Sequence, residues 1–248
     1  GMIWAMAAGQ IPRTLLAELI RTLKRRGVDY ADVRYEQVLH ESVVVEDNKV
    51  KAISLTESAG VGIRVLIGGS WGFAATPHLS ARPLTRALTH AVEIARASSA
   101  INKRPLRLAT VEPQRAVHRS SWEIDPFEVP LAKKLDYLFW ASSVLFGPAS
   151  IKRATAHMDF SKVCKYFTST DGAHVEQSFI ESGAGLEAVA QQGGEVQSRS
   201  YPNSHHGALA QAGFEYVKQL DLVGGAKTIQ TEVLHLLRAK PPKAGLAT

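Results

Sequence analysis

A glycine-rich pentapeptide, Gly68-Gly69-Ser70-Trp71-Gly72, is the most direct candidate for catalytic chemistry in this sequence. It matches the G-x-S-x-G pattern of the nucleophile elbow, in which the serine lies on a sharp turn from a strand into a helix. Here a β-like run over residues 71–76 follows the serine, and Pro77 ends that run. The pattern therefore predicts a hairpin turn, with a structural role for Ser70.

The nine histidines lack the spacing of a metal site. His40-Glu41 begins as a zincin motif would, but valines occupy the positions where a second histidine should follow. No two histidines are three or four residues apart, so no helix presents two ligands on one face. His205 and His206 are adjacent, which directs extended side chains to opposite sides. His157 and His174 could meet across a sheet, but no further ligand completes a site.

The remaining reactive side chains favour structural roles. Cys164 is the only cysteine, which excludes an intrachain disulfide and favours a small buried residue in a reducing compartment, the cytoplasm. Four carboxylates follow strand positions and are expected to face solvent: Glu176, Glu181, Glu187 and Glu195. The sequence therefore assigns no catalytic, cofactor-binding or metal-binding residue.

The basic charge does not indicate a nucleic-acid partner, although the net charge is +6. The charges are dispersed, and the one dense cluster, Lys24-Arg25-Arg26, precedes Gly27. Cations at that place stabilise the negative end of a helix dipole. No apolar run approaches the roughly 20 residues that span a bilayer. We therefore expect neither nucleic acid nor a membrane as a partner.

The order of elements follows from hydrophobic periodicity. Leucines and isoleucines at helical spacing predict a helix over residues 15–23, after Pro12. Alternating runs at 41–46, 50–55, 60–67 and 71–76 then predict strands, joined by turns at 46–49 and 68–70. Ser80 is the expected N-cap of a helix with its apolar stripe over residues 84–95. A proline-containing linker over residues 101–129 holds at most one short strand.

The second half repeats this order. A helix is predicted over residues 131–145, after Pro130. Period-two runs at 157–160 and 163–168 predict a first strand pair with its bend near 159–162. Turns at Thr170-Asp171-Gly172 and Gly193-Gly194 continue a meander to residue 201, and Gly183 and Gly185 indicate a bulge or bend. A last helix begins at Leu222 and ends before Pro241-Pro242.

These elements predict an α+β protein with an antiparallel hairpin sheet, a β-meander and segregated flanking helices. We expect a first subdomain over residues 11–100, a linker over 101–129 and a second subdomain over 130–248.

The succession EDNKVKAIS, GVGIRV and GGSWGFAAT, over residues 46–76, resembles the N-terminal region of the TldD/PmbA family, also called modulators of DNA gyrase. The likeness runs from about Leu15 to Gly245. Full-length members resemble two-part zinc peptidases whose zinc motif, His-Glu-x-x-x-His, lies in a C-terminal domain. That motif is absent here, so the resemblance implies a chain without the catalytic domain, with no cofactor of its own and with zinc held by the missing part.

Two functions fit this resemblance. In the first, the chain is the substrate-enclosing and oligomerisation part of a zinc metallopeptidase, inactive alone, and a sheet edge holds a peptide by strand addition. Its partners would then be a second copy or a TldD/PmbA-like subunit, together with the peptide substrate. In the alternative, the chain is a stand-alone, non-catalytic module that binds a peptide or a partner protein.

Overall fold

The computed structural model describes residues 11–204 and 207–240, which form two compact units. Unit 1 takes residues up to Leu39, residues 56–120 and residues 162–179. Unit 2 takes residues 40–55, residues 121–161 and the chain from Ile180 onward. The units are therefore interleaved along the chain, whereas the sequence predicted two consecutive subdomains, 11–100 and 130–248, with a linker at 101–129 between them.

The interleaving arises because four long strands each contribute one end to each unit. They are β1 (Tyr30–Glu46), β2 (Lys49–Ile67), β5 (Ile151–Ser169) and β6 (His174–Gln192). Alternation of period two continues along each strand, so the sequence carries no break where one unit ends and the other begins. For the same reason two expectations were wrong. The runs 50–55 and 60–67 are one strand, and no bend at 159–162 divides β5.

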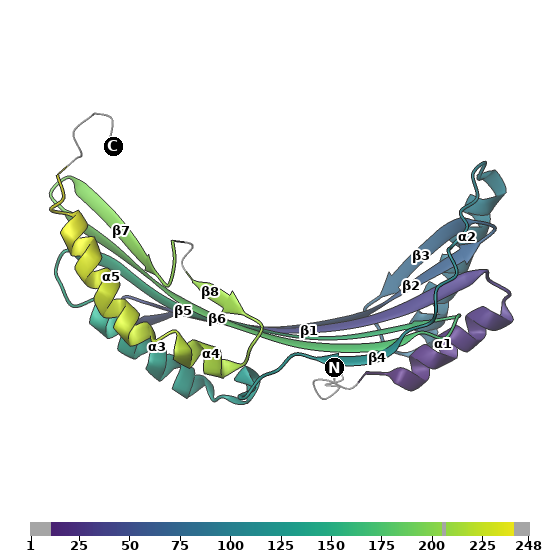
Figure 1. The fold of residues 1–248 in the computed structure, drawn as a ribbon, viewed down its shortest axis with the longest axis horizontal. Helices are drawn as coiled ribbons and strands as arrows, with labels where there is room; N and C mark the ends of the chain where they lie inside the picture. Colours follow the sequence, from purple (N-terminus) through teal and green to yellow (C-terminus); the bar gives the residue numbers. More distant parts are fainter. Residues whose placement is uncertain (1–10, 205–206, 241–248) are drawn as a thin grey trace. The chain divides into compact units, whose positions relative to one another are not determined.

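In unit 1 the strand order is β3-β2-β1-β5-β6-β4, where β3 is Ser70–Thr76 and β4 is Arg115–Arg119. β3 pairs with β2 in antiparallel orientation, whereas β4 pairs with β6 in parallel orientation. Helices α1 (Arg13–Arg25) and α2 (Ala81–Ile101) lie together on one face of the sheet (Figure 1). Their apolar stripes form one core with the inward residues of β1, β2 and β3.

Two-residue loops with positive φ close the hairpins. Asp47 and Asn48 have φ of 51° and 59° in the β1–β2 turn of unit 2, and Gly68 and Gly69 have φ of 55° and 72° in the β2–β3 turn of unit 1. Left-handed conformations at both loop positions match the twist of paired strands. Both predicted turns are therefore confirmed, with an aspartate and an asparagine replacing glycine in the first.

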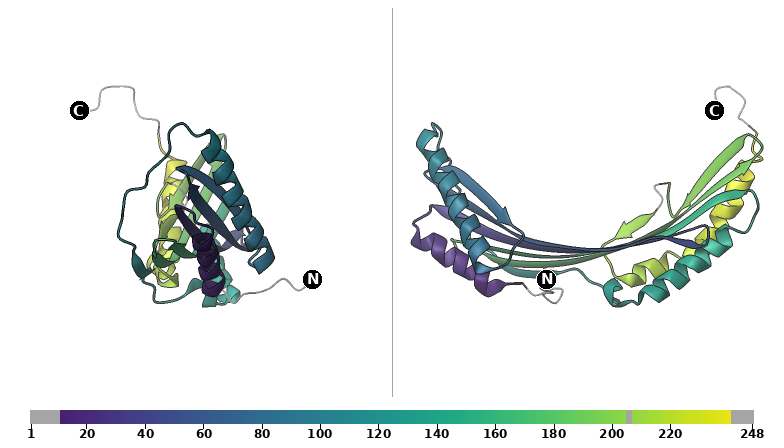
Figure 2. Two further views of the ribbon diagram at one scale, coloured as in Figure 1. Left: turned by 90° about the vertical axis from the view of Figure 1, so that its right-hand side faces the viewer. Right: turned by 180° about the vertical axis from the view of Figure 1, so that it is seen from behind.

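Unit 2 packs its helices on one face of its part of the sheet (Figure 2). The helical elements are η1 (Pro126–Glu128), α3 (Leu131–Leu145), α4 (Phe214–Gln219) and α5 (Leu222–Leu236). The core joins α3, α4 and α5 to β1, β5 and β6. A charged pair lies in this core: Lys134 donates to Glu41 at 2.5 Å and its Nζ lies 4.8 Å from the centre of the Phe160 ring.

The outer edge of β6 in unit 2 is paired with two further strands, β7 (Glu195–Tyr201) and β8 (Ala208–Ala210). β6 is a single strand through Gly183 and Gly185, where the sequence predicted a bulge or bend. Gly183 allows a close approach instead, because a Cβ there would lie 2.6 Å from the carbonyl oxygen of Ala208.

The four longer predicted helices are confirmed as α1, α2, α3 and α5, whereas α4 and β8 were not predicted. Ser80 is the N-cap residue of α2, but its side chain makes no capping hydrogen bond. Among the residues described, none of the helices is long and apolar enough to cross a membrane.

Candidate functional site

Among the described residues, strand β3 has a free edge in unit 1. It is the terminal strand of the sheet order, paired with β2 in a register that runs from Ile67↔Ser70 to Val61↔Thr76. In a hairpin with a two-residue loop the closing pair is hydrogen-bonded, and hydrogen-bonded pairs alternate from there. The backbone N–H and C=O groups of Trp71, Phe73 and Ala75 are therefore directed at the free edge.

Close packing on α2 fixes the position of this strand. At Gly72, an added Cβ would lie 2.0 Å from the carbonyl oxygen of Ala91 and 2.6 Å from the amide nitrogen of Ala95. At the hairpin end, Leu106 donates its backbone N–H to Gly69 at 2.9 Å. The strand is thus held in place by α2 and by Leu106, while the outer edge of residues 71–76 remains available for pairing.

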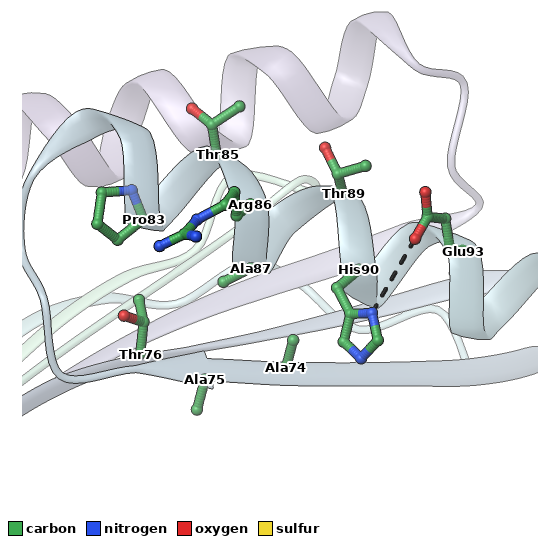
Figure 3. A pocket seen from close by; sticks show the side chains of 10 residues that line it. All are labelled: Ala74, Ala75, Thr76, Pro83, Thr85, Arg86, Ala87, Thr89, His90 and Glu93. Carbon is green, nitrogen blue, oxygen red and sulfur yellow. Dashed lines mark ion pairs between the residues drawn. The ribbon is translucent and has the colours of Figure 1, made fainter.

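A groove of about 610 Å³ runs beside this edge, between β3 and α2 (Figure 3). β3 contributes Ala74, Ala75 and Thr76, and helix α2 contributes the remaining lining residues: Pro83, Thr85, Arg86, Ala87, Thr89, His90 and Glu93. The small side chains of β3 leave its backbone accessible. The groove can therefore take an extended chain that pairs with β3.

The two ends of the groove carry opposite charges. Arg86, His90 and Glu93 recur at helical spacing on the exposed side of α2, opposite its buried stripe. Figure 3 shows Arg86 toward the Thr76 end of β3 and Glu93 beyond His90. The Nδ1 atom of His90 lies 4.0 Å from Oε2 of Glu93.

Cations and aromatic rings alternate on the opposite face of the unit 1 sheet. Asp32 is only 1% exposed and accepts from Nε and Nη2 of Arg64 at 2.9 and 2.6 Å. The guanidinium of Arg64 lies 4.5 Å from the centre of the Trp71 ring, and that of Arg34 lies 5.3 Å from Phe167. Because Asp32 fixes Arg64, and Arg64 stacks on Trp71, this face of β3 is preorganised.

Tyr30 completes this aromatic cluster. Its ring meets Trp71 edge to face at a centroid distance of 5.9 Å. The pKa of Tyr30 is raised to about 12, mainly by burial and then by the nearby Asp32 carboxylate. The phenol therefore remains neutral beside the buried carboxylate at neutral pH.

Ser70 is structural in its surroundings. Its side chain is buried and accepts a hydrogen bond from Nδ2 of Asn102 at 2.7 Å. Ser70 is the first residue of strand β3, so a strand rather than a helix follows the turn. The elbow geometry is therefore absent, as the sequence predicted. Cys164 is partly buried, with Sγ 3.8 Å from the hydroxyl of Ser178.

The histidines considered from sequence have separate surroundings. His174 Nδ1 lies 3.1 Å from the Tyr166 hydroxyl and 3.2 Å from that of Thr168, in unit 1. In unit 2, Nε2 atoms of His40 and His157 lie 4.0 and 3.9 Å from the Asp159 carboxylate. His157 and His174 thus each have partners of their own, in different units.

His205 and His206 lie outside the described residues. Within the described ranges, no group of three or more histidine, cysteine, aspartate and glutamate side chains is arranged to hold a metal ion.

The charged candidates are ordinary parts of the fold. Arg25 ends α1, and Gly27 follows with φ of 66°, which agrees with the expected helix terminus. Glu176 is not simply solvent-facing, because it accepts two hydrogen bonds from Arg13 at 2.6 and 2.7 Å. This pairing is the main reason that the pKa of Glu176 is lowered. Glu187 pairs with Arg153 at 3.3 Å.

Sequence reasoning identified β3 as a strand but missed the groove beside it. Two signals were present: Pro77 directly after the strand, and the polar stripe of Arg86, His90 and Glu93 opposite the apolar positions of α2. Neither reveals that β3 is the last strand in the sheet, because strand order depends on pairings distant in sequence.

Comparison with known proteins relates the chain to one family. Residues 31–99 match the model of PmbA/TldA metallopeptidase domain 1. A metalloprotease of Methanothermobacter thermautotrophicus is 23% identical over 95% of this chain and 49% of its own length. A metalloprotease TldD homolog of Buchnera aphidicola is 30% identical over 38% of this chain and 20% of its own length. The chain thus spans about half the length of the first of these relatives.

Two solved structures share the fold. A Thermotoga maritima protein described as a modulator of a DNA gyrase has a TM-score of 0.74 and 16% identity, over 94% of this chain and 50% of its own. TldE of Thermococcus kodakarensis has a TM-score of 0.61 and 15% identity, over 90% of this chain and 47% of its own. Through the matched domain, the relatives and the shared α+β fold, this chain is similar to proteins of the TldD/PmbA family.

Proposed function

We propose that this chain is the N-terminal, substrate-enclosing and oligomerisation part of a TldD/PmbA-like zinc metallopeptidase, and that the free edge of β3 holds an extended peptide. The observation that carries the proposal is that edge, beside the groove on α2. Backbone pairing with an edge strand binds a peptide without demanding a particular sequence. Such binding suits a peptidase that acts on unfolded chains.

In this proposal the chain contributes no hydrolytic chemistry. The described residues offer no metal-binding group, and the relatives named as metalloproteases are about twice as long as this chain. Zinc and the catalytic residues would come from the part that the relatives have beyond the matched half. A second copy or a TldD/PmbA-like subunit is the proposed protein partner.

The first expectation is therefore that the purified chain binds peptide but does not cleave it. A blocked peptide of alternating threonine and valine would bind measurably by calorimetry, and mass spectrometry after incubation with zinc would find it intact. Cleavage by the purified chain, lost on removal of metal, would contradict the non-catalytic part of the proposal.

The binding site is tested by proline substitution. Ala75→Pro removes a backbone donor directed at the free edge and leaves the hydrogen-bonded pairs with β2 in place. We expect it to weaken peptide binding at least about tenfold, since a strand addition loses a backbone hydrogen bond and meets a steric clash. Ala109→Pro, in an exposed segment outside the strands, is the matched control. Equal binding by wild type and Ala75→Pro would place the peptide elsewhere.

A further inference from the structure

The groove beside β3 has a direction, and this direction decides which peptides it prefers. A strand that pairs with β3 places alternate side chains on the two faces of the sheet. Residues opposite Gly72, Ala74 and Thr76 face the groove, because these β3 positions face α2. Residues opposite Trp71 and Phe73 face the aromatic side of the sheet.

The aromatic side favours apolar residues. Phe73 is 60% exposed, and Trp71 is fixed by Arg64 stacked on its ring. Side chains directly across a strand pair are about 5 Å apart, and aromatic or β-branched partners stabilise such pairs. The bound peptide should therefore carry apolar residues at every second position.

The groove side favours two opposite charges in a fixed order. Arg86 lies toward the Thr76 end of the groove, and Glu93 lies seven residues farther along α2, toward the other end (Figure 3). Both side chains are exposed and on α2. Arg86 and Glu93 are seven helical residues apart, which is about 10 Å. Neighbouring groove-facing residues of a bound peptide are two strand residues apart, which is about 7 Å. Flexible glutamate and lysine side chains on the peptide can span this difference.

We propose that the β3 edge selects extended peptides with the N-to-C order apolar, acidic, apolar, basic, apolar, bound antiparallel to β3. An antiparallel strand starts beside Thr76, so its acidic residue meets Arg86 and its basic residue meets Glu93. Antiparallel pairing is the more stable kind per residue. This inference rests on the proposed peptide-holding function and adds a substrate class to it.

Two blocked peptides of identical composition test the order: Thr-Val-Glu-Phe-Lys-Val-Thr and Thr-Val-Lys-Phe-Glu-Val-Thr. Each exposed ion pair contributes up to about 1 kcal/mol and the reversed order replaces attraction by repulsion, so the first peptide should bind at least about fivefold more tightly at low salt. The preference should shrink as salt is added. Calorimetry gives both dissociation constants.

The charge-swapped variant, Arg86→Glu with Glu93→Arg, is the matched control. Both positions are exposed, so the fold is retained, which circular dichroism checks. In this variant the second peptide should bind more tightly than the first. Equal binding of the two peptides by wild type, or a preference for the second, overturns the inference and leaves the proposed function standing. No binding of either peptide removes the proposed function together with it.

Discussion

At the scale of single residues, the most unusual feature is the charged pair in the core of unit 2. Lys134 is 1% exposed and its ammonium group contacts both the Glu41 carboxylate and the Phe160 ring. A buried charge is costly unless it is paired, so the two residues depend on each other. Lys134 shares a helix face with Leu138 and Leu145, but lysine is almost never fully buried unless it is paired, and the distant partner Glu41 could not be predicted from the sequence.

We expect Lys134→Met to destabilise the protein by about 3–5 kcal/mol, because it leaves the Glu41 carboxylate buried without a cation. The double variant Glu41→Leu with Lys134→Met should recover most of that loss. Urea unfolding measures both. In the exposed pair Arg153–Glu187, Arg153→Met should cost at most about 1 kcal/mol. A Lys134→Met protein as stable as wild type would contradict this account.

Tyr30 predicts how stability depends on alkaline pH. Its pKa is raised from 10.0 to about 12 by burial first and then by Asp32. Between these values the unfolded chain releases the phenol proton while the folded protein keeps it, so the free energy of unfolding falls as pH rises. The contribution of Tyr30 is complete below about pH 10 and is lost as the pH approaches 12.

Urea unfolding of wild type and Tyr30→Phe at a series of pH values tests this contribution. The variant should show a shallower decline between pH 10 and 12, and below pH 10 the two proteins should follow parallel trends. Identical slopes above pH 10 would show that Tyr30 does not keep its proton in the folded protein.

At the scale of elements, the sequence predicted those features that depend on residues close to one another in the chain. Pro12, Gly27 and Pro130 marked helix ends correctly, and Gly68-Gly69 marked a turn. Strand length was not accessible in the same way, because period-two alternation does not record where a partner begins or ends. The free edge of β3 could not be predicted either, because it depends on the strand order. The polar stripe on α2 is visible in the sequence, but only the structure shows that β3 lies beside it.

The contact between α2 and β3 depends on Gly72, which can be tested by adding a methyl group there. Gly72→Ala should destabilise the protein by about 1–3 kcal/mol or more, because the new methyl group would meet backbone atoms of Ala91 and Ala95 that cannot move independently. Gly60→Ala is the matched control in the same hairpin, since its nearest contact is an ordinary 3.4 Å. Thermal unfolding compares the two, and equal melting temperatures would contradict the close packing.

At the scale of the whole molecule, exposed strand edges bear on self-association. The candidate contacts are the meander, residues 151–201, the last helix and the start of β2. Within unit 2, β7 and β8 pair with the edge of β6, whereas β2 pairs with β3 only from Val61 onward. The start of β2 carries three exposed apolar side chains, Val50, Ile53 and Leu55. Unpaired strand edges with exposed apolar side chains tend to pair with strands of other chains.

We therefore predict self-association through the start of β2. Ile53→Lys should shift the protein toward monomer in light scattering, because a charge on an edge strand opposes pairing with a second copy. Val196→Lys, on the exposed surface of β7, is the matched control and should leave association unchanged. A greater effect of Val196→Lys would return the contact to the meander, and a monomeric wild type at high micromolar concentration would exclude both contacts.

The interleaved strands also determine when the chain can fold during its synthesis. Unit 1 needs residues 162–179 as well as the segments before Ser120, so it stays incomplete until Phe179 has left the ribosome. Ribosomes add roughly 5–20 residues per second, so the first helices and hairpin wait several seconds for their missing strands. During that interval the edge of β1 that pairs with β5 is open to other nascent chains. Production of this protein should therefore respond strongly to chaperone supply and to translation rate, more than a chain of equal length with consecutive domains.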